Sequence, residues 1–83
     1  MNHRIASIDA EVERAAAEVD MLRHIDDDAQ RDAIVTDHAE DRQVARITRR
    51  DVRRAERYVE KLLRNRANLV AKRDRAIDKL ARG

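Results

Sequence analysis

Apolar residues in the first third of the chain recur at helical spacing. They follow one another at alternating intervals of three and four positions, and the set is Ile5, Ile8, Val12, Ala15, Val19 and Leu22. This alternation is the a/d pattern of a coiled-coil heptad. Continued along the chain, it places Asp26 at an a position and then weakens to Ala29 and Ala33. The pattern predicts a first helix over residues 3–33.

A second apolar stripe occupies the last third of the chain. It begins with Val52, Ala55, Val59 and Leu62, widens into the pairs Leu62/Leu63, Leu69/Val70 and Ala76/Ile77, and ends at Leu80. A face that drifts in this way favours a straight helix over a strict supercoil. Thr48 followed by Asp51 fits a capping box, and Gly83 follows the last turn. We expect a second helix over residues 48–82, with an earlier start as the alternative.

The segment between the two stripes holds few large apolar residues. Asp and Thr side chains compete with the helical backbone for hydrogen bonds, and the β-branched run Ile34-Val35-Thr36 lies here. We therefore expect the chain to turn within residues 34–41. The alternative is a short third helix over residues 37–47 that uses Val44 and Ile47.

The amino-acid composition favours α-helix over any other regular secondary structure. The 83 residues include 14 alanines, the best helix former, and no proline, and Gly83 is the only glycine. Strand formers and turn glycines are too scarce to build a sheet. We expect an all-α protein, a single domain over residues 1–83 folded as an antiparallel hairpin of two long helices. Because a core of this size is marginal by itself, we also expect assembly into a dimeric or larger bundle.

Charge is divided unequally between the two halves of the chain. Residues 1–41 hold 4 basic and 12 acidic side chains, a net charge of −8, whereas residues 42–83 hold 15 basic and 5 acidic, a net charge of +10. An antiparallel hairpin, or an antiparallel dimer, lays the acidic helix along the basic one. The carboxylates expected beside the arginines of residues 49–66 are Glu11, Glu13, Glu18 and Asp20.

Equal arms around a turn near residue 36 would end near residue 69. Residues 70–83 would then overhang and expose apolar side chains that nothing in the same chain covers. The predicted protein interface is Arg66, Leu69, Val70, Arg73, Ile77 and Leu80. The two arginines of this set lie on the apolar stripe. Either their stems follow the stripe while the guanidinium groups reach water or a carboxylate, or they form buried pairs that set the helix register.

The densest basic cluster follows i, i+3/i+4 spacing and would form a ridge on one helix face. The candidate nucleic-acid contacts are Arg46, Arg49, Arg50, Arg53, Arg54 and Arg57. Arginine outnumbers lysine by 16 to 3, and arginine suits bidentate phosphate contacts. The competing interpretations are a solvated face, pairing with the acidic helix, and a GC-rich gene. No aromatic residues interleave, which argues against single-strand recognition.

The sequence contains no convincing metal-binding or catalytic motif. Asp26, Asp28, Gln30, Asp32 and Asp37 match the calcium-loop spacing, but Arg31 stands where the loop needs glycine, and Asp37 replaces the bidentate glutamate. The three histidines have no zinc-type spacing, and the chain contains no cysteine. No catalytic constellation is readable. We expect no enzymatic activity, cofactor, metal or small-molecule substrate.

These observations favour a small interaction or structural module that self-associates or binds a protein partner. The alternative is a nucleic-acid-binding regulator in which the acidic helix competes with nucleic acid for the arginine ridge. No apolar run approaches the roughly 18 residues of a membrane span, and the N-terminus lacks a signal-peptide core. We therefore expect no membrane association and a cytoplasmic location.

Overall fold

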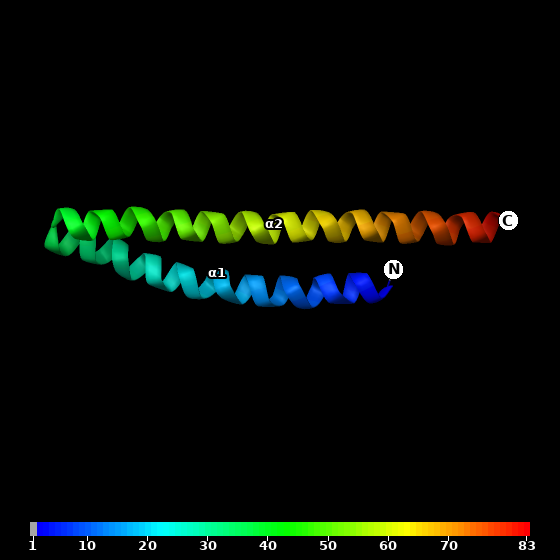
Figure 1. Cartoon of the computed structure of the whole chain (residues 1–83), viewed down its shortest axis with the longest axis horizontal. Coiled ribbons are helices and arrows are strands. Elements are labelled where there is room, and N and C mark those ends of the chain that lie inside the picture. The colour runs from blue at the N-terminus through cyan, green and yellow to red at the C-terminus, as the bar shows by residue number, and fades with distance from the viewer. Residues whose placement is uncertain (1) are drawn as a thin grey trace.

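The computed structural model describes residues 2–83, which form two helices joined by a short turn. Helix α1 covers Asn2–Thr36 and helix α2 covers Ala39–Arg82. They run antiparallel side by side (Figure 1), so the predicted all-α hairpin is confirmed. The molecule is a rod of 68 × 15 × 12 Å. Since a helix rises about 1.5 Å per residue, the 44 residues of α2 set the length of the rod.

The turn consists of Asp37 and His38, within the predicted window of residues 34–41. Asp37 has a φ of 52°, in the left-handed region that aspartate tolerates better than most residues. Its amide donates to the Ala33 carbonyl at 3.2 Å and thereby closes α1. The Arg42 guanidinium returns from α2 and donates to the Asp37 carboxylate at 2.7 Å and to its carbonyl at 2.9 Å. The turn therefore forms without a glycine, with Asp37 in the left-handed position that glycine usually occupies.

Helix α2 starts at the turn and continues without a break. His38 is its N-cap in an extended conformation, and Glu40 and Asp41 place negative charge at the positive end of the helix dipole. The helix start at residue 48 is wrong and the alternative of an earlier start is confirmed. A separate third helix over residues 37–47 is also wrong, because no helix-breaking residue separates it from the rest of α2. At the other end, Gly83 caps α2 as expected and donates its amide to the Lys79 and Leu80 carbonyls.

Burial follows the heptad pattern on both helices. The buried residues are Ile5, Ala15, Val19, Asp26 and Ala29 on α1, and Ala45, Val52 and Leu62 on α2. On α2 a strict alternation of three and four runs from residue 45 to residue 76, and none of its members is exposed. The expected drift towards a straight 3.6-residue face is therefore wrong. The apolar stripe of the sequence places Leu63 in the core beside Leu62, but Leu63 is 47% exposed, because it belongs to a second stripe beside this seam.

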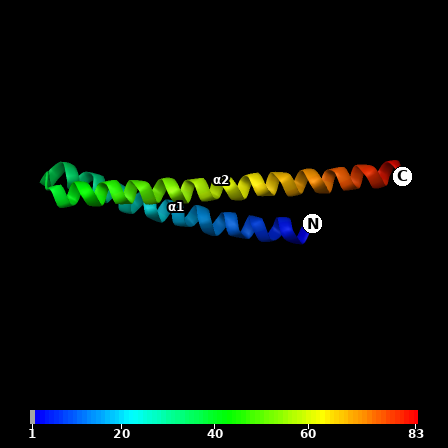
Figure 2. The same cartoon turned by 45° about the horizontal axis from the view of Figure 1, so that its top comes forward.

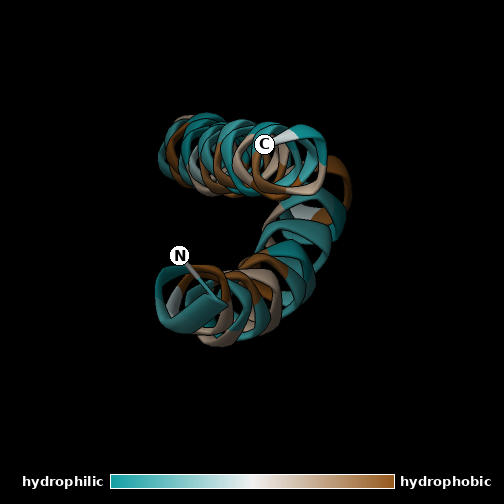
Figure 3. Cartoon of the chain, turned by 90° about the vertical axis from the view of Figure 1, so that its right-hand side faces the viewer, coloured by the Kyte–Doolittle hydropathy of each residue, from teal (hydrophilic) through white to brown (hydrophobic). Residues whose placement is uncertain are grey.

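Residues equally distant from the turn face each other across the seam. Gln30 of α1 donates to the Ala45 carbonyl of α2 at 2.8 Å, and the Arg73 guanidinium lies 3.5 Å from the Asn2 side-chain oxygen. Beyond Arg73, α2 continues past the end of α1 (Figures 1 and 2). An end-on view shows that α1 bows sideways as it follows α2 (Figure 3), as long helices do when they wrap around a partner. No described side chain is completely shielded from solvent.

Candidate interaction surfaces

A polar cluster is built into the apolar seam around Asp26. This residue occupies an a position of α1, and its side chain is only 12% exposed. Its Oδ1 atom accepts hydrogen bonds from the Thr48 hydroxyl of α2 at 2.8 Å and from the Gln30 amide at 2.9 Å. The Nε atom of Arg49 lies 3.9 Å from Oδ2. No buried side-chain nitrogen or oxygen among the described residues lacks a partner, so the cluster is fully satisfied.

The surroundings of Asp26 keep its carboxylate ionised. Burial by itself would raise the pKa, but the hydrogen bonds from Gln30 and Thr48 and the positive charges of Arg49 and Arg53 outweigh it. The net effect lowers the pKa of Asp26 below its ordinary value. Sequence reasoning placed this residue on the seam but did not assign it a role. The available signal was a charged residue at an a position, which specifies register in coiled coils.

The contacts between the acidic and basic helices are few and lie along the edges of the seam. Arg66 pairs with Asp9, and Tyr58 donates its hydroxyl to Glu11, which raises the pKa of Tyr58. A third pair has the opposite polarity, with Arg23 of α1 2.9 Å from Glu56 of α2. Of the four carboxylates expected beside the arginines, only Glu11 forms a hydrogen bond with α2 among the described residues, and its partner is Tyr58 and not an arginine. The opposed charges of the two halves are therefore not arranged as a ladder of ion pairs.

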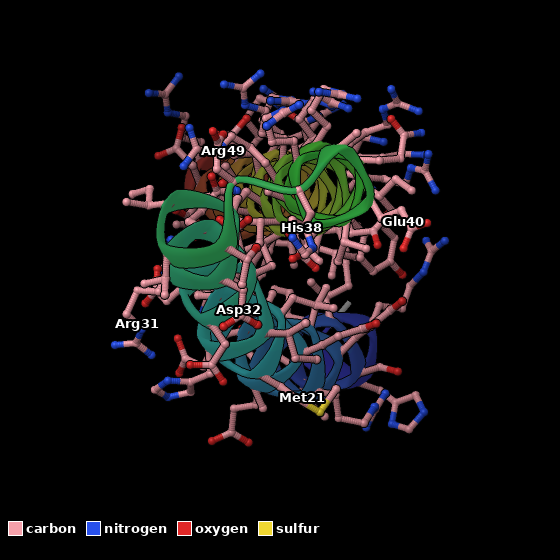
Figure 4. All side chains as sticks on the ribbon, turned by 90° about the vertical axis from the view of Figure 1, so that its left-hand side faces the viewer. Met21, Arg31, Asp32, His38, Glu40 and Arg49 are labelled. Carbon is pink, nitrogen blue, oxygen red and sulfur yellow. The ribbon has the colours of Figure 1, made fainter. Side chains whose placement is uncertain are left out.

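The six arginines predicted to contact nucleic acid are all exposed on α2. We call Arg46, Arg49, Arg50, Arg53, Arg54 and Arg57 the arginine face. Viewed from the turn end, nitrogen-tipped side chains gather over α2 on the side away from α1 (Figure 4). Arg49 leans towards Asp26, and Arg46 donates to Gln43. Within residues 2–83, the remaining four arginines form no ion pair.

The predicted protein interface is divided between two locations. Arg66, Leu69 and Arg73 are half-buried members of the seam, and the arginines reach Asp9 and Asn2 of α1 with partly exposed guanidinium groups. Their stems therefore follow the seam while their heads reach polar partners at its edge. The remaining members, Val70, Ile77 and Leu80, lie outside the part of the seam that α1 covers.

These three residues and Leu63 form an apolar strip that we call the C-terminal stripe, with Leu63, Val70, Ile77 and Leu80 as its members. Spacings of seven place Leu63, Val70 and Ile77 on one line along α2, and Leu80, three residues further, lies beside this line where the alternation of the seam continues past residue 76. Ile77 is 57% and Leu80 83% exposed, and Val70 is half-buried. The sequence pattern assigned Leu63 to the core together with Leu62, but only Leu62 is buried and Leu63 belongs to the exposed strip.

The described residues offer no enclosed chemical site. The grooves between the helices are open, and one of them is lined by Glu18, Leu22, Asp51, Arg54, Ala55 and Tyr58. No group of three or more potential metal ligands occurs in residues 2–83. The acidic residues with calcium-loop spacing lie mostly along helix α1 and are not wrapped around a common centre.

Comparison of the chain with protein-family models, with curated protein sequences and with solved structures finds no match. Neither α1 nor α2, as described, contains a stretch long and apolar enough to cross a membrane. Inferences about function therefore rest on the surfaces of the hairpin itself.

Proposed function

We propose that this protein is a non-enzymatic helical module that self-associates through the C-terminal stripe. The observation that carries the proposal is the difference in length between the helices. With 35 residues in α1 and 44 in α2, α2 extends past its cover and leaves Leu80 in water, next to Ile77 on the side of the helix that α1 does not cover. Apolar side chains at helical spacing on an uncovered helix are the usual basis for pairing with another helix.

A second copy of the chain is the occupant that the stripe fits. Residues 74–83 span only about 15 Å of helix, too short a segment for the roughly 800 Å² per partner of a standard interface. Extension back to Leu63 makes the surface nearly twice as long and joins it to the side of the hairpin. The whole C-terminal half of α2 then takes part, and two identical stripes can cover each other.

Electrostatics favours an antiparallel arrangement of the two copies. In a parallel pair, the arginine faces of both chains would lie side by side and repel each other. In an antiparallel pair centred on Val70, Leu63 of one copy meets Ile77 of the other, and the arginine faces lie at opposite ends. Asp74 and Asp78 also come near the basic end of the partner's helix. A two-fold axis relates the copies, as in most dimers.

Sedimentation equilibrium up to several hundred micromolar tests the association. We expect a concentration-dependent dimer that Ile77→Asp abolishes while helicity stays intact. Ile47→Asp is the matched control, because Ile47 is also a half-exposed isoleucine of α2 but lies outside the C-terminal stripe. A wild-type chain that stays monomeric throughout would refute the proposal, as would equal loss of dimer in the control.

Disulfide trapping tests the orientation, since the chain has no cysteine of its own. In an antiparallel pair centred on the middle of the stripe, Val70→Cys forms a disulfide with its own copy. Ile77→Cys then forms one only when mixed with Leu63→Cys. Self-linkage of Ile77→Cys in preference to this mixed product would contradict the antiparallel arrangement.

A further inference from the structure

We infer that the arginine face is a docking surface for double-stranded DNA. This inference concerns a different face from the C-terminal stripe and does not depend on self-association. It rests on three observations. Most arginines of the face form no ion pair within the chain, they are spread around one side of α2, and no aromatic side chain lies among them.

The acidic helix does not neutralise the arginine face by contact. Arg49 alone reaches an α1 carboxylate, at 3.9 Å from Asp26. Glu11 is engaged by Tyr58, and Asp20 lies 3.8 Å from Arg23 of its own helix. Arg46 donates to the neutral Gln43 side chain. The other four arginines of the face, Arg50, Arg53, Arg54 and Arg57, are exposed and form no ion pair within residues 2–83. Their charge is therefore available to an external anion.

The distribution of the arginines suits a groove bounded by two phosphate strands. At 100° per residue, Arg46, Arg50, Arg53, Arg54 and Arg57 fall within an arc of about 100° on the side of α2 opposite the seam. Arg53 and Arg54 lie at the two edges of this arc, about 100° apart around the helix axis. The stretch from Arg46 to Arg57 is about 16 Å long. Arginines on both flanks of one helix can reach both walls of a groove at once.

The dimensions favour B-form DNA over other polyanions. A helix with its side chains is about 10–12 Å across and enters the major groove, which is about 12 Å wide. The major groove of A-form RNA is too deep and narrow for side chains to read. No aromatic side chain lies on this face to stack single-stranded bases, because Tyr58, the only aromatic residue, donates to Glu11 on the other side. The contacts are to phosphates, so binding is expected with little sequence preference.

Fluorescence anisotropy of a labelled 24-base-pair DNA duplex, titrated with the full chain at about 50 mM salt, tests the inference. We expect binding that weakens with added salt, with a log–log slope of about −4 for four released counterions. The variant with Arg50, Arg53, Arg54 and Arg57 changed to Gln should lose at least about tenfold in affinity and most of this slope. Its circular dichroism should stay unchanged, because these side chains are exposed, and its melting temperature should change only slightly, because Arg53 is one of several groups that favour the ionised form of Asp26.

The matched control changes Arg14, Arg31, Arg75 and Arg82 to Gln, four exposed arginines outside the face. It removes the same net charge and should lose less than about threefold in affinity. Equal loss in both variants would overturn the inference by assigning binding to net charge alone. Absence of binding at low salt, or tighter binding to an RNA duplex, a single strand or anionic vesicles, would overturn it as well. Ile77→Asp should bind the duplex in its monomeric form, which separates this test from that of self-association.

Discussion

The Thr48 hydroxyl of α2 donates a hydrogen bond of 2.8 Å to the Asp26 carboxylate of α1 across the apolar seam. Thr48 also contacts the carbonyl of Ala45 at 3.1 Å, and Gln30 reaches both Asp26 and that same carbonyl. A sliding of one helix along the other would break all the cross-helix members of this set and leave a charge among apolar side chains. The cluster therefore specifies the register of the hairpin, at a cost in burial that an apolar residue would not incur.

Replacement of Asp26 by Leu is expected to stabilise the hairpin. The leucine would fill an a position of the seam, and burial of such a side chain contributes about 2 kcal/mol. Gln30 and Thr48 would keep the Ala45 carbonyl as a partner. The substitution should instead reduce the specificity of helix pairing, which would appear as a mixture of oligomers in sedimentation experiments. A lower melting temperature for this variant would contradict the assignment of Asp26 to register.

The stability of the hairpin should depend on the ionisation of Asp26. Its pKa in the folded chain is lowered, so its contribution is present above the ordinary aspartate pKa of about 3.9 and is lost as the pH falls through the lowered value. Asp26→Asn keeps an oxygen acceptor but carries no charge. The melting temperature of the wild type should exceed that of this variant at neutral pH, and the difference should shrink below about pH 4. A difference that is constant with pH would exclude a role for the charge.

A negative charge at Leu62 should unfold the hairpin, whereas a negative charge at Ile77 should not. Leu62 is 6% exposed and Ile77 57% exposed. Leu62→Asp buries an unpaired charge at a cost of at least about 3 kcal/mol, a large share of the stability of a small domain. Ile77→Asp changes an exposed residue and should remove only association. Circular dichroism at low micromolar concentration measures the helicity of both variants, and equal loss of helicity would show that Ile77 also supports the monomer fold.

The backbone conformation of Asp37 gives a separate test of the turn. Its φ of 52° is costly for a β-branched residue. Asp37→Val should destabilise the hairpin by about 1–2 kcal/mol. Asp37→Gly removes the steric penalty but also the contact with Arg42, which is exposed and contributes little, so its melting temperature should stay close to that of the wild type. Similar losses in both variants would assign the stability of the turn to the Asp37 side chain.

The amino-acid sequence by itself determined the class of fold and the composition of the seam. Alternating spacings of three and four over Ile5–Leu22 predict an amphipathic helix without reference to any contact, because periodicity is a property of the chain alone. The β-branched and acidic residues near Asp37 likewise located the turn. The excess of arginine in residues 42–57 was equally visible.

Tertiary structure decided which of these features face each other. Thr48 is not a helix cap, because α2 already begins at Ala39, and the pairing of α1 with α2 makes it a partner of Asp26 instead. It separated buried Leu62 from exposed Leu63, since α1 covers only one side of α2. It also directed the arginine face away from the acidic helix, which charge counting by halves could not do, because net charge contains no direction.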